Sequence, residues 1–266
     1  MTDAPTITQA PVLALTWRGQ NLFQLTILAP PGDWGDPGRL AKLRAWGQPP
    51  AGQPLLDRPF SVHRYRPGAR ELDFLIRVVG PGTQALAQLR PGQTLQITGP
   101  LGQGLRRLQP DFPQTPLYLV AGGVGLAPQA NLLDQLQAPA HLFYGERRGQ
   151  ALIDHDYLAG LAPNFTAISE DGLGYGQKGQ VTEPLLAALN QERRAIFACG
   201  PPGLLTALAP VARTYKVPYW ASVEAFLACG LGVCLSCSRA LTDGSRIRLC
   251  QDGPVVDGLT LDWGKP

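Results

Sequence analysis

Four cysteines near the C-terminal end constrain this chain more than any other feature of its sequence. Three have the spacing CxxxxCxxC and the fourth follows after twelve further residues, at Cys229, Cys234, Cys237 and Cys250. CxxxxCxxC is the opening of the plant-type spacing that binds a [2Fe-2S] cluster through four thiolates, although the last cysteine comes early here. Gly230 and Gly232 lie between the first two thiols, where a missing Cβ lets the backbone wrap closely around sulfide. The spacing therefore predicts a one-electron centre.

Two other uses of these cysteines compete with the cluster. A structural zinc site with four cysteine ligands usually pairs two CxxC knuckles, whereas this chain has one CxxC. A zinc-stabilised interaction module stays as the alternative of another functional class. Two disulfides in a secreted protein fit less well, because there are five cysteines and the N-terminal residues carry Asp3 and no basic segment. We expect a reducing, cytoplasmic setting.

The composition argues against several kinds of partner. The chain has 266 residues, which is long enough for about two domains. Its hydrophobic content of 44% suffices for a hydrophobic core in each. Charged residues make up only 16%, the net charge is +3 and no block of like charges occurs, so neither nucleic acid nor an anionic membrane is indicated. Glycines and prolines interrupt the longest nearly apolar stretch, residues 195–212, which argues against a membrane span. The sparse charge leaves room for a buried protein interface.

The two halves of the chain have different hydrophobic patterns and therefore different predicted secondary structure. Strand-like segments such as residues 22–28 and 72–79 alternate with Pro/Gly turns in the N-terminal part, which predicts an antiparallel sheet or small barrel. The Gly- and Pro-rich residues 30–54 are compatible with either a strand with long loops or an excursion. From Pro116 onward, LYLVAG, a helix through Leu136 and HLFYGE form a βα unit of a parallel sheet. Residues 195–199 and 219–223 are expected as later strands of that sheet, around a helix over residues 204–215.

Three short motifs outside the cysteines could carry chemistry. The first is the tetrapeptide RPFS, in which an arginine can clamp a pyrophosphate, an aromatic ring can lie on a flat ring and a hydroxyl can bind a heteroatom. The second is GGVGLAP, from Gly122 to Pro128, whose glycines let backbone N–H groups approach a phosphate at the start of a helix. The third is Cys199, Gly200 and Pro201 at the end of an apolar strand. Each also has a structural reading: a surface arginine beside a core phenylalanine, a tight turn without ligand, and a small buried thiol.

The order of these motifs is more specific than any one of them. RPFS, GGVGLAP and a CGP after a strand occur in the order typical of ferredoxin-reductase-like flavoproteins, which place a flavin barrel before a nicotinamide-binding domain. EAFLACGLGVCLSC, LCQDGPVV and SEDGLGYGQKGQVT narrow this further, because they resemble the electron-transfer subunits of class 1B dihydroorotate dehydrogenases. The resemblance implies a FAD-binding β-barrel over residues 1–112, a Rossmann-like NAD-binding α/β domain over 113–222 and a [2Fe-2S] module over 223–266. The expected fold class is therefore β + α/β.

The resemblance also assigns residues to cofactors. FAD is expected at Arg58, Pro59, Phe60, Ser61, Leu75, Ile76, Arg77, Gly82 and Thr83. NAD is expected at Gly122, Gly123, Gly125, Pro128 and Gly200, with Cys199 as the catalytic candidate near the nicotinamide and residues 170–172 lining the same crevice. The cluster is expected on the four cysteines of the C-terminal loop.

The activity that the resemblance implies is electron relay in pyrimidine (UMP) biosynthesis. A separate FMN-containing catalytic subunit oxidises dihydroorotate, and electrons pass from it through the cluster and FAD to NAD, in an assembly expected to be a heterotetramer with the cluster loop near the subunit interface. Small subunits of NAD(P)H-dependent ferredoxin oxidoreductases and sulfide dehydrogenases share this architecture and are the alternative. Some of those proteins replace a cluster cysteine with aspartate, whereas all four positions here are cysteine.

Overall fold

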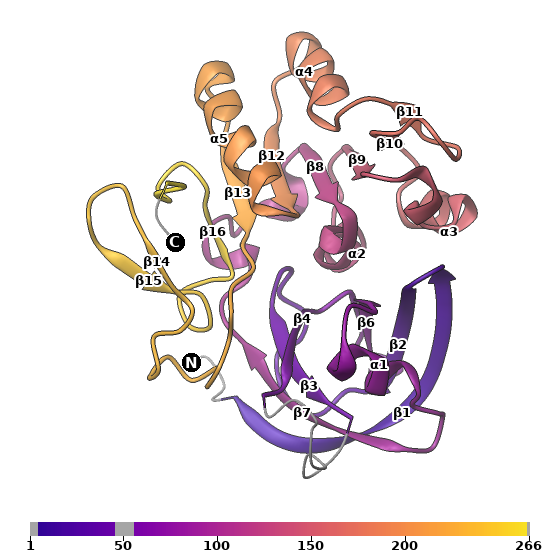
Figure 1. The fold of residues 1–266 in the computed structure, drawn as a ribbon. Coiled ribbons are helices and arrows are strands. Elements are labelled where there is room, and N and C mark those ends of the chain that lie inside the picture. The colour runs from indigo at the N-terminus through magenta and orange to yellow at the C-terminus, as the bar shows by residue number, and fades with distance from the viewer. Residues whose placement is uncertain (1–4, 46–55, 265–266) are drawn as a thin grey trace.

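The computed structural model describes residues 5–45 and 56–264, and the first half of them forms an antiparallel sheet (Figure 1). Its seven strands have the order β4-β3-β7-β1-β2-β6-β5. They are β1 (Thr6–Gly19), β2 (Leu22–Leu28), β3 (Leu40–Arg44), β4 (Arg58–Ser61), β5 (Arg64–Arg66), β6 (Glu71–Arg77) and β7 (Thr94–Leu101), with helix α1 (Pro81–Ala87) between β6 and β7. The antiparallel sheet predicted for the N-terminal part is confirmed.

The second sheet is mostly parallel and has the order β11-β10-β9-β8-β12-β13-β16. Its strands are β8 (Leu117–Gly122), β9 (Ala140–Glu146), β10 (Phe165–Ser169), β11 (Gln177–Lys178), β12 (Ala195–Cys199), β13 (Tyr219–Ser222) and β16 (Val255–Asp257). The helices are α2 (Ala127–Leu133), α3 (His155–Leu161), α4 (Thr182–Gln191) and α5 (Pro202–Tyr215). After β8 the chain builds outward on one side through β9 to β11, and it then crosses to the other side of β8 with β12. The predicted parallel α/β domain is confirmed.

Short elements complete the chain and join the C-terminal segment to the second sheet. Four 3-10 turns are η1 (Leu105–Arg107), η2 (Phe112–Gln114), η3 (Gly123–Leu126) and η4 (Gly149–Ala151). A small hairpin of β14 (Ser238–Ala240) and β15 (Arg246–Arg248) follows the cysteine loop. The last strand, β16, then pairs antiparallel with β13. The segment assigned to the cluster is therefore hydrogen-bonded to the nucleotide sheet, and the domain boundaries at 112 and 222 stay a prediction.

The sequence pattern located the regular elements well and their ends less well. The strands expected at residues 22–28, 117–122 and 195–199 have those limits. The helix expected through Leu136 ends at Leu133, and the strand expected to reach Val79 ends at Arg77. In both places the chain passes into a turn whose backbone N–H groups find other partners: Val78 N donates to the backbone oxygen of Asn21, and Leu136 N to that of Leu133.

Within the Gly- and Pro-rich residues 30–54, the structure contains a strand of the first sheet. Residues Leu40–Arg44 form β3, which pairs with both β4 and β7. Gly38 precedes it with φ +93°, and a Cβ there would lie 2.2 Å from Cγ2 of Val255 in the C-terminal segment. Residues 46–55 of this region lie outside the described residues.

Three hydrophobic clusters hold these layers together. One fills the first sheet, and the other two lie on the two faces of the second sheet. Leu22 and Leu75 of the first sheet belong to a cluster of the second, so the two domains share a core. Cys237 and Cys250 belong to the other cluster, which anchors the cysteine loop to the nucleotide domain. In the part of the chain that the structure describes, no helix combines the length and apolar character that a bilayer span requires.

Candidate functional site

A cavity of about 370 Å³ lies where the first sheet meets helix α2 and the segment after β13. Seven of the nine residues predicted to bind FAD line it: Arg58, Pro59, Phe60, Ser61, Leu75, Arg77 and Thr83. Val124 in the turn before α2 and Ala127, the first residue of α2, also line it. Residues separated by long stretches of sequence are thus brought together around one cavity that combines two arginines, a hydroxyl and apolar side chains. Arginines suit a pyrophosphate and the apolar walls suit a flat ring system.

The Gly82-Thr83 pair supports the arginine wall of this cavity. A Cβ on Gly82 would lie 3.1 Å from Nε of Arg58, so the arginine packs directly over this glycine. Oγ1 of Thr83 accepts hydrogen bonds from the backbone N–H groups of Val79 (2.9 Å) and Gly80 (3.1 Å), which fixes the start of α1. Gly82 therefore acts through Arg58 and does not itself line the cavity.

Strand β6 supplies the cavity with alternate residues. Leu75 and Arg77 line the cavity, whereas Ile76 is fully buried in the core of the first sheet. Successive side chains of a strand point to opposite faces, so residues 75 and 77 share a face that residue 76 cannot reach. A contact of the Ile76 side chain with a cofactor is not supported by this arrangement, and a backbone contact stays a prediction.

A second cavity, of about 560 Å³, lies at the carboxyl ends of the parallel strands. It is lined by Gly122 at the end of β8 and the following Gly123, by Glu146 at the end of β9, by Glu170 after β10 and by Gly203 at the start of α5. β8 and β12 are the neighbouring strands at which the order of the sheet reverses, and open α/β sheets bind ligands at that place. The predicted nucleotide turn is therefore located where the topology favours a nucleotide.

The glycines of this turn allow it to lie against strand β12. A Cβ on Gly125 would lie 2.1 Å from the backbone oxygen of Cys199, and a Cβ on Gly200 would lie 3.0 Å from Cα of Gly122. Gly123 has φ +58°, in the left-handed region that favours glycine. Gly125, Gly200 and the buried Pro128 do not line the cavity, so their sequence pattern reflects close packing of the turn, and their contact with NAD stays a prediction.

An ion pair joins the two cavities. Arg77 lines the first cavity, Glu146 lines the second, and the guanidinium of Arg77 donates to Oε1 of Glu146. The hydroxyl of Tyr144 donates to the same oxygen at 2.9 Å. Burial raises the pKa of Glu146, while the adjacent Arg77 opposes that shift. The Arg77–Glu146 ion pair thus joins a residue of the first cavity's wall to a residue of the second cavity's wall.

Cys199, the catalytic candidate, is a buried thiol between the two sites. It is 1% exposed and lines neither cavity, and burial raises its pKa well above its ordinary value. The thiol hydrogen-bonds Ser222 and is close enough to Glu224 to be influenced by its charge. Both of these residues line the first cavity, and burial also raises the pKa of Glu224. Cys199 is therefore a neutral thiol behind the cavity wall, and a catalytic role for it stays a prediction.

The loop after β10 shapes the far side of the nucleotide cavity. Oδ1 of Asp171 accepts hydrogen bonds from the backbone N–H groups of Gly149 (2.9 Å) and Leu173 (3.0 Å). These two bonds lower the pKa of Asp171, with that from Leu173 the larger influence. Glu170 lines the cavity, as predicted for this segment, whereas Asp171 organises the loop and Gly172 does not reach the cavity.

The start of the cysteine loop is held by contacts with the first sheet and lies beside the first cavity. Gly230 and Gly232 have φ values of +76° and +77°, so both use the left-handed conformation that glycine allows. Nζ of Lys42 on β3 donates to the backbone oxygen of Ala228 at 2.7 Å. The loop also begins beside the first cavity, because Leu227 lines that cavity two residues before Cys229.

The four thiols are arranged as two neighbouring pairs. Cys234 hydrogen-bonds Cys229, and Cys250 hydrogen-bonds Cys237. Across residues 5–45 and 56–264, no three His, Cys, Asp or Glu side chains converge in a way that could hold a single metal ion. Two pairs of thiolates are the donor set that a two-iron cluster requires, with one pair for each iron. The residues present therefore fit a [2Fe-2S] cluster.

Hydrogen bonds within the loop favour the thiolate form at its exposed side. The hydroxyl of Ser236, 3.1 Å from Sγ of Cys234, is the largest of several contacts that lower the pKa of Cys234 to about 6. Leu231 N also donates to Sγ of Cys229 at 3.3 Å. On the inner side, burial raises the pKa of Cys250 to about 12. Thiolates are the form that binds metal, so Cys234 is closer to its binding state than Cys250.

The outer surface of the loop is apolar. Four side chains on it are largely exposed: Phe226 (67%), Leu231 (50%), Val233 (76%) and Leu235 (60%). We call these four residues the loop patch. Exposed apolar residues gathered on one segment mark a surface that contacts another molecule.

Sequence reasoning missed several residues that line the first cavity, among them Ser222, Glu224 and Leu227. Ser222 is the last residue of the last parallel strand, β13, and Glu224 and Leu227 lie between that strand and the first cluster cysteine. Ser222 and Glu224 are polar residues at the carboxyl end of a buried parallel strand, which is the position where ligand contacts concentrate. Their position at the end of an apolar strand could have identified them from the sequence as ligand contacts.

Comparisons with known proteins identify the families to which the two C-terminal parts of the chain are similar. Residues 119–209 match the family described as the oxidoreductase NAD-binding domain, and residues 224–262 match the iron-sulfur cluster binding domain of dihydroorotate dehydrogenase B. A dihydroorotate dehydrogenase B (NAD(+)) electron transfer subunit from Clostridium acetobutylicum is 33% identical over 85% of this chain and 85% of that protein. The protein of the same name from Desulforamulus reducens is 29% identical over 96% of this chain and 97% of its own length.

Solved structures share the fold. An NADH-dependent reduced ferredoxin-NADP oxidoreductase matches with a TM-score of 0.80 and 24% identity, over 96% of this chain and 90% of that chain. A ferredoxin NADP+ reductase from Neisseria gonorrhoeae, solved with FAD and NADP, matches with a TM-score of 0.59 and 18% identity, over 79% of this chain and 91% of its own. At these identities the likeness supports the architecture of two sheets described above.

Proposed function

Since the chain belongs to the family of dihydroorotate dehydrogenase B electron transfer subunits, we propose that it relays electrons between a dihydroorotate-oxidising subunit and NAD through a [2Fe-2S] cluster and FAD. The observation that carries this proposal is that the flavin cavity is directly connected to both the nucleotide cavity and the cluster loop. The flavin cavity is lined by Leu227, which leads directly into the cluster loop, and by Arg77, which is ion-paired to the nucleotide cavity.

The first cavity would hold FAD. Arg58 and Arg77 would bind its phosphates, with Arg58 supported by Gly82, and Ser61 would donate to the ring system. A bound flavin exchanges electron pairs with a nicotinamide and single electrons with an iron-sulfur cluster. Phe60 and Val124, which both line the cavity, would hold the ring in place, and the apolar lining would exclude water.

The second cavity would hold NAD at the carboxyl edge of the parallel sheet. The glycine turn would bring backbone N–H groups toward the pyrophosphate. Glu170 and Arg147 both lie on the wall of the same cavity, so its charges alone do not select the cofactor, but the relatives of this family are named for NAD(+). We therefore propose NAD, and not NADP, as the acceptor.

The cysteine loop would hold the cluster and present it to the partner. Cys229 and Cys234 would bind one iron, and Cys237 and Cys250 the other, as their pairing suggests. The loop patch would contact the FMN-containing catalytic subunit, because it surrounds the exposed pair with apolar surface. All five cysteines are free thiols, which suits a reducing compartment, and we place the protein in the cytoplasm.

Metal and flavin analysis tests this proposal directly. Protein purified or reconstituted without oxygen should contain FAD and about two irons per chain, and show the combined absorption of flavin and cluster. NADH should bleach the flavin absorption. Zinc in stoichiometric amount, without iron or flavin, would overturn the proposal and support a zinc-stabilised module.

A further inference from the structure

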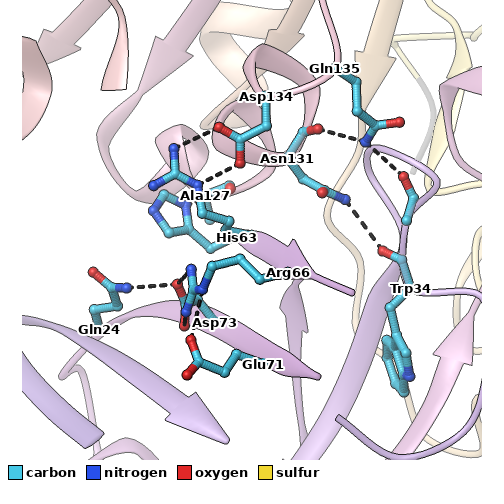
Figure 2. A network of polar contacts seen from close by, with 12 residues as sticks. Gln24, Trp34, His63, Arg66, Glu71, Asp73, Ala127, Asn131, Asp134 and Gln135 are labelled. Atoms are coloured by element: carbon cyan, nitrogen blue, oxygen red, sulfur yellow. Dashed lines mark hydrogen bonds and ion pairs between the residues drawn. The ribbon is translucent and has the colours of Figure 1, made fainter. Parts of the chain in front are cut away.

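His63 lies at the joint between the first sheet and helix α2, two residues after strand β4 (Figure 2). Its imidazole is fully buried. Nδ1 lies 2.8 Å from the backbone oxygen of Ala127, the first residue of α2, and Nε2 lies 2.5 Å from the hydroxyl of Tyr157 on α3. A single side chain of the first sheet therefore contacts two helices of the nucleotide domain.

These contacts define the protonation of His63. A carbonyl oxygen can only accept a hydrogen bond, so Nδ1 carries the proton and donates to Ala127. Nε2 is then an acceptor, and the hydroxyl of Tyr157 donates to it. Burial lowers the pKa of His63 to about 4, so the imidazole is neutral at physiological pH and keeps this one tautomer.

The backbone around His63 is held by the first sheet. The N–H of His63 donates to the backbone oxygen of Asp73 at 2.8 Å, and the N–H of Val62 donates to that of Arg39 at 2.9 Å. The carboxylate of Asp73 is fully buried and accepts two hydrogen bonds from Arg66, at 2.7 and 2.9 Å. The imidazole thus projects from a fixed part of the first sheet toward α2.

Other polar contacts across this joint involve the residues that directly follow α2. Arg64 binds Asp134 through two hydrogen bonds of 2.6 and 2.7 Å, and the side chain of Gln135 donates to the backbone oxygen of Gly35 at 2.8 Å (Figure 2). His63 alone among these contacts reaches the first residue of α2. That residue, Ala127, lines the flavin cavity, and the turn before it lines the nucleotide cavity.

We propose that His63 is a positioning residue whose hydrogen bond to Ala127 sets the distance between the flavin strand Arg58–Ser61 and the nicotinamide turn Gly122–Leu126. The proposal rests on the proposed function, because it assigns a role in electron transfer between the two cavities. A small displacement of Ala127 would move one wall of each cavity. Transfer between two bound groups depends steeply on their separation, so the rate would fall while binding of each group is retained.

Two substitutions test the two hydrogen bonds of His63 one at a time. His63→Asn can place an amide N–H near the position of Nδ1, which keeps the donor to Ala127 and loses the contact with Tyr157. His63→Gln can place an amide oxygen near the position of Nε2, which keeps the acceptor for Tyr157 and loses the contact with Ala127. Each variant removes one hydrogen bond from the same buried site, so a purely structural role would affect the two variants alike.

The first measurement is the rate of flavin reduction by saturating NADH, followed by stopped-flow absorption of the FAD-loaded full chain. His63→Gln should be about tenfold slower than wild type, with NADH affinity changed little, whereas His63→Asn should stay near the wild-type rate. Asp134→Asn serves as the matched control, because it breaks a joint contact that does not involve Ala127, and its rate should be unchanged. Equal rates in the Asn and Gln variants would overturn the proposal.

The second measurement does not depend on electron transfer. Hydrogen exchange of the amides at residues 129–133 in the full chain should be faster in His63→Gln than in His63→Asn, because only the Gln variant frees the start of α2. Equal exchange in these two variants would overturn the positioning role. If wild-type flavin is not reduced by NADH, the proposed function fails, and the exchange measurement still decides whether His63 fixes the helix.

Discussion

The joint between the two sheets and the cysteine loop are built in opposite ways. At the joint, polar groups are buried and paired within the chain, as in the contacts of His63 with Ala127 and of Arg77 with Glu146. On the loop, Val233 and Leu235 point outward and are 76% and 60% exposed. The comparison teaches that the walls of the flavin and nucleotide cavities are tied together within the chain, whereas the cluster loop exposes an apolar surface that we propose contacts the catalytic subunit.

Removal of one cluster thiol should give the largest effect. In Cys237→Ser the buried ligand is lost, so iron should fall from about two per chain to almost none, while FAD is retained because its cavity does not include this residue. Iron and flavin assays on the purified protein measure both quantities. Cys199→Ser is the matched control and should keep its iron, because Cys199 lies outside the loop. Loss of iron in the control, or its retention in Cys237→Ser, would contradict the assignment.

Acid should weaken the joint through His63. The unfolded chain takes up this proton near pH 6.5, whereas the folded protein does so only near its folded pKa of about 4. Titration of His63 should therefore leave the free energy of unfolding independent of pH above pH 6.5. Between pH 6.5 and pH 4 it should lower that free energy by about 3 kcal/mol. Denaturant unfolding of wild type and His63→Asn across this range measures the contribution, because all other titrating groups are common to both proteins. Parallel pH profiles of the two proteins would show that His63 does not contribute.

Close packing of the nucleotide turn should make Gly125 intolerant of a side chain. Because an added Cβ would lie 2.1 Å from the backbone oxygen of Cys199, Gly125→Ala should lower the free energy of unfolding by about 2 kcal/mol. Gly160→Ala provides the control, since Gly160 lies in α3 with nothing within 4 Å of an added Cβ, and it should stabilise slightly. Chemical denaturation measures both. Equal effects of the two substitutions would contradict the close approach of turn and strand.

A charge on the loop patch should weaken partner binding with the smallest effect of the four. Val233→Glu should raise the Kd for the catalytic subunit about tenfold, because a carboxylate would be buried in an apolar interface. Ile7→Glu, at an equally exposed apolar residue of β1, should leave the Kd unchanged. Titration of the two subunits by calorimetry measures these values. Weakening by Ile7→Glu to the same extent would place the interface elsewhere.

The local motifs of the molecule could be predicted from sequence because their chemistry depends on spacing. The four cysteines, the RPFS strand and the glycine turn lie close in sequence within each motif, and their order identified the family and the two domains. Ile76 was predicted as a flavin contact with its neighbours, although the alternation of a strand places it on the opposite face from Leu75 and Arg77. This alternation can be read from the sequence alone, so a contact of Ile76 with the flavin stays a prediction for its backbone only.

The contacts that join the sites could not be predicted in this way. Arg77 and Glu146 are 69 residues apart, and His63 and Ala127 are 64 apart, so no local pattern links them. Each pair arises from the docking of two domains whose relative placement depends on many apolar contacts. Residues 46–55, whose geometry the sequence left open, lie outside the described residues.

The relay itself is tested most directly by turnover with the partner. A catalytic dihydroorotate dehydrogenase subunit should be assayed for NADH formation from dihydroorotate and NAD, alone and with this chain carrying FAD and cluster. The account predicts NADH formation only when the chain is present, and its loss when Cys237→Ser replaces the wild type. Equal NADH formation with and without the chain would contradict the claim that it relays electrons.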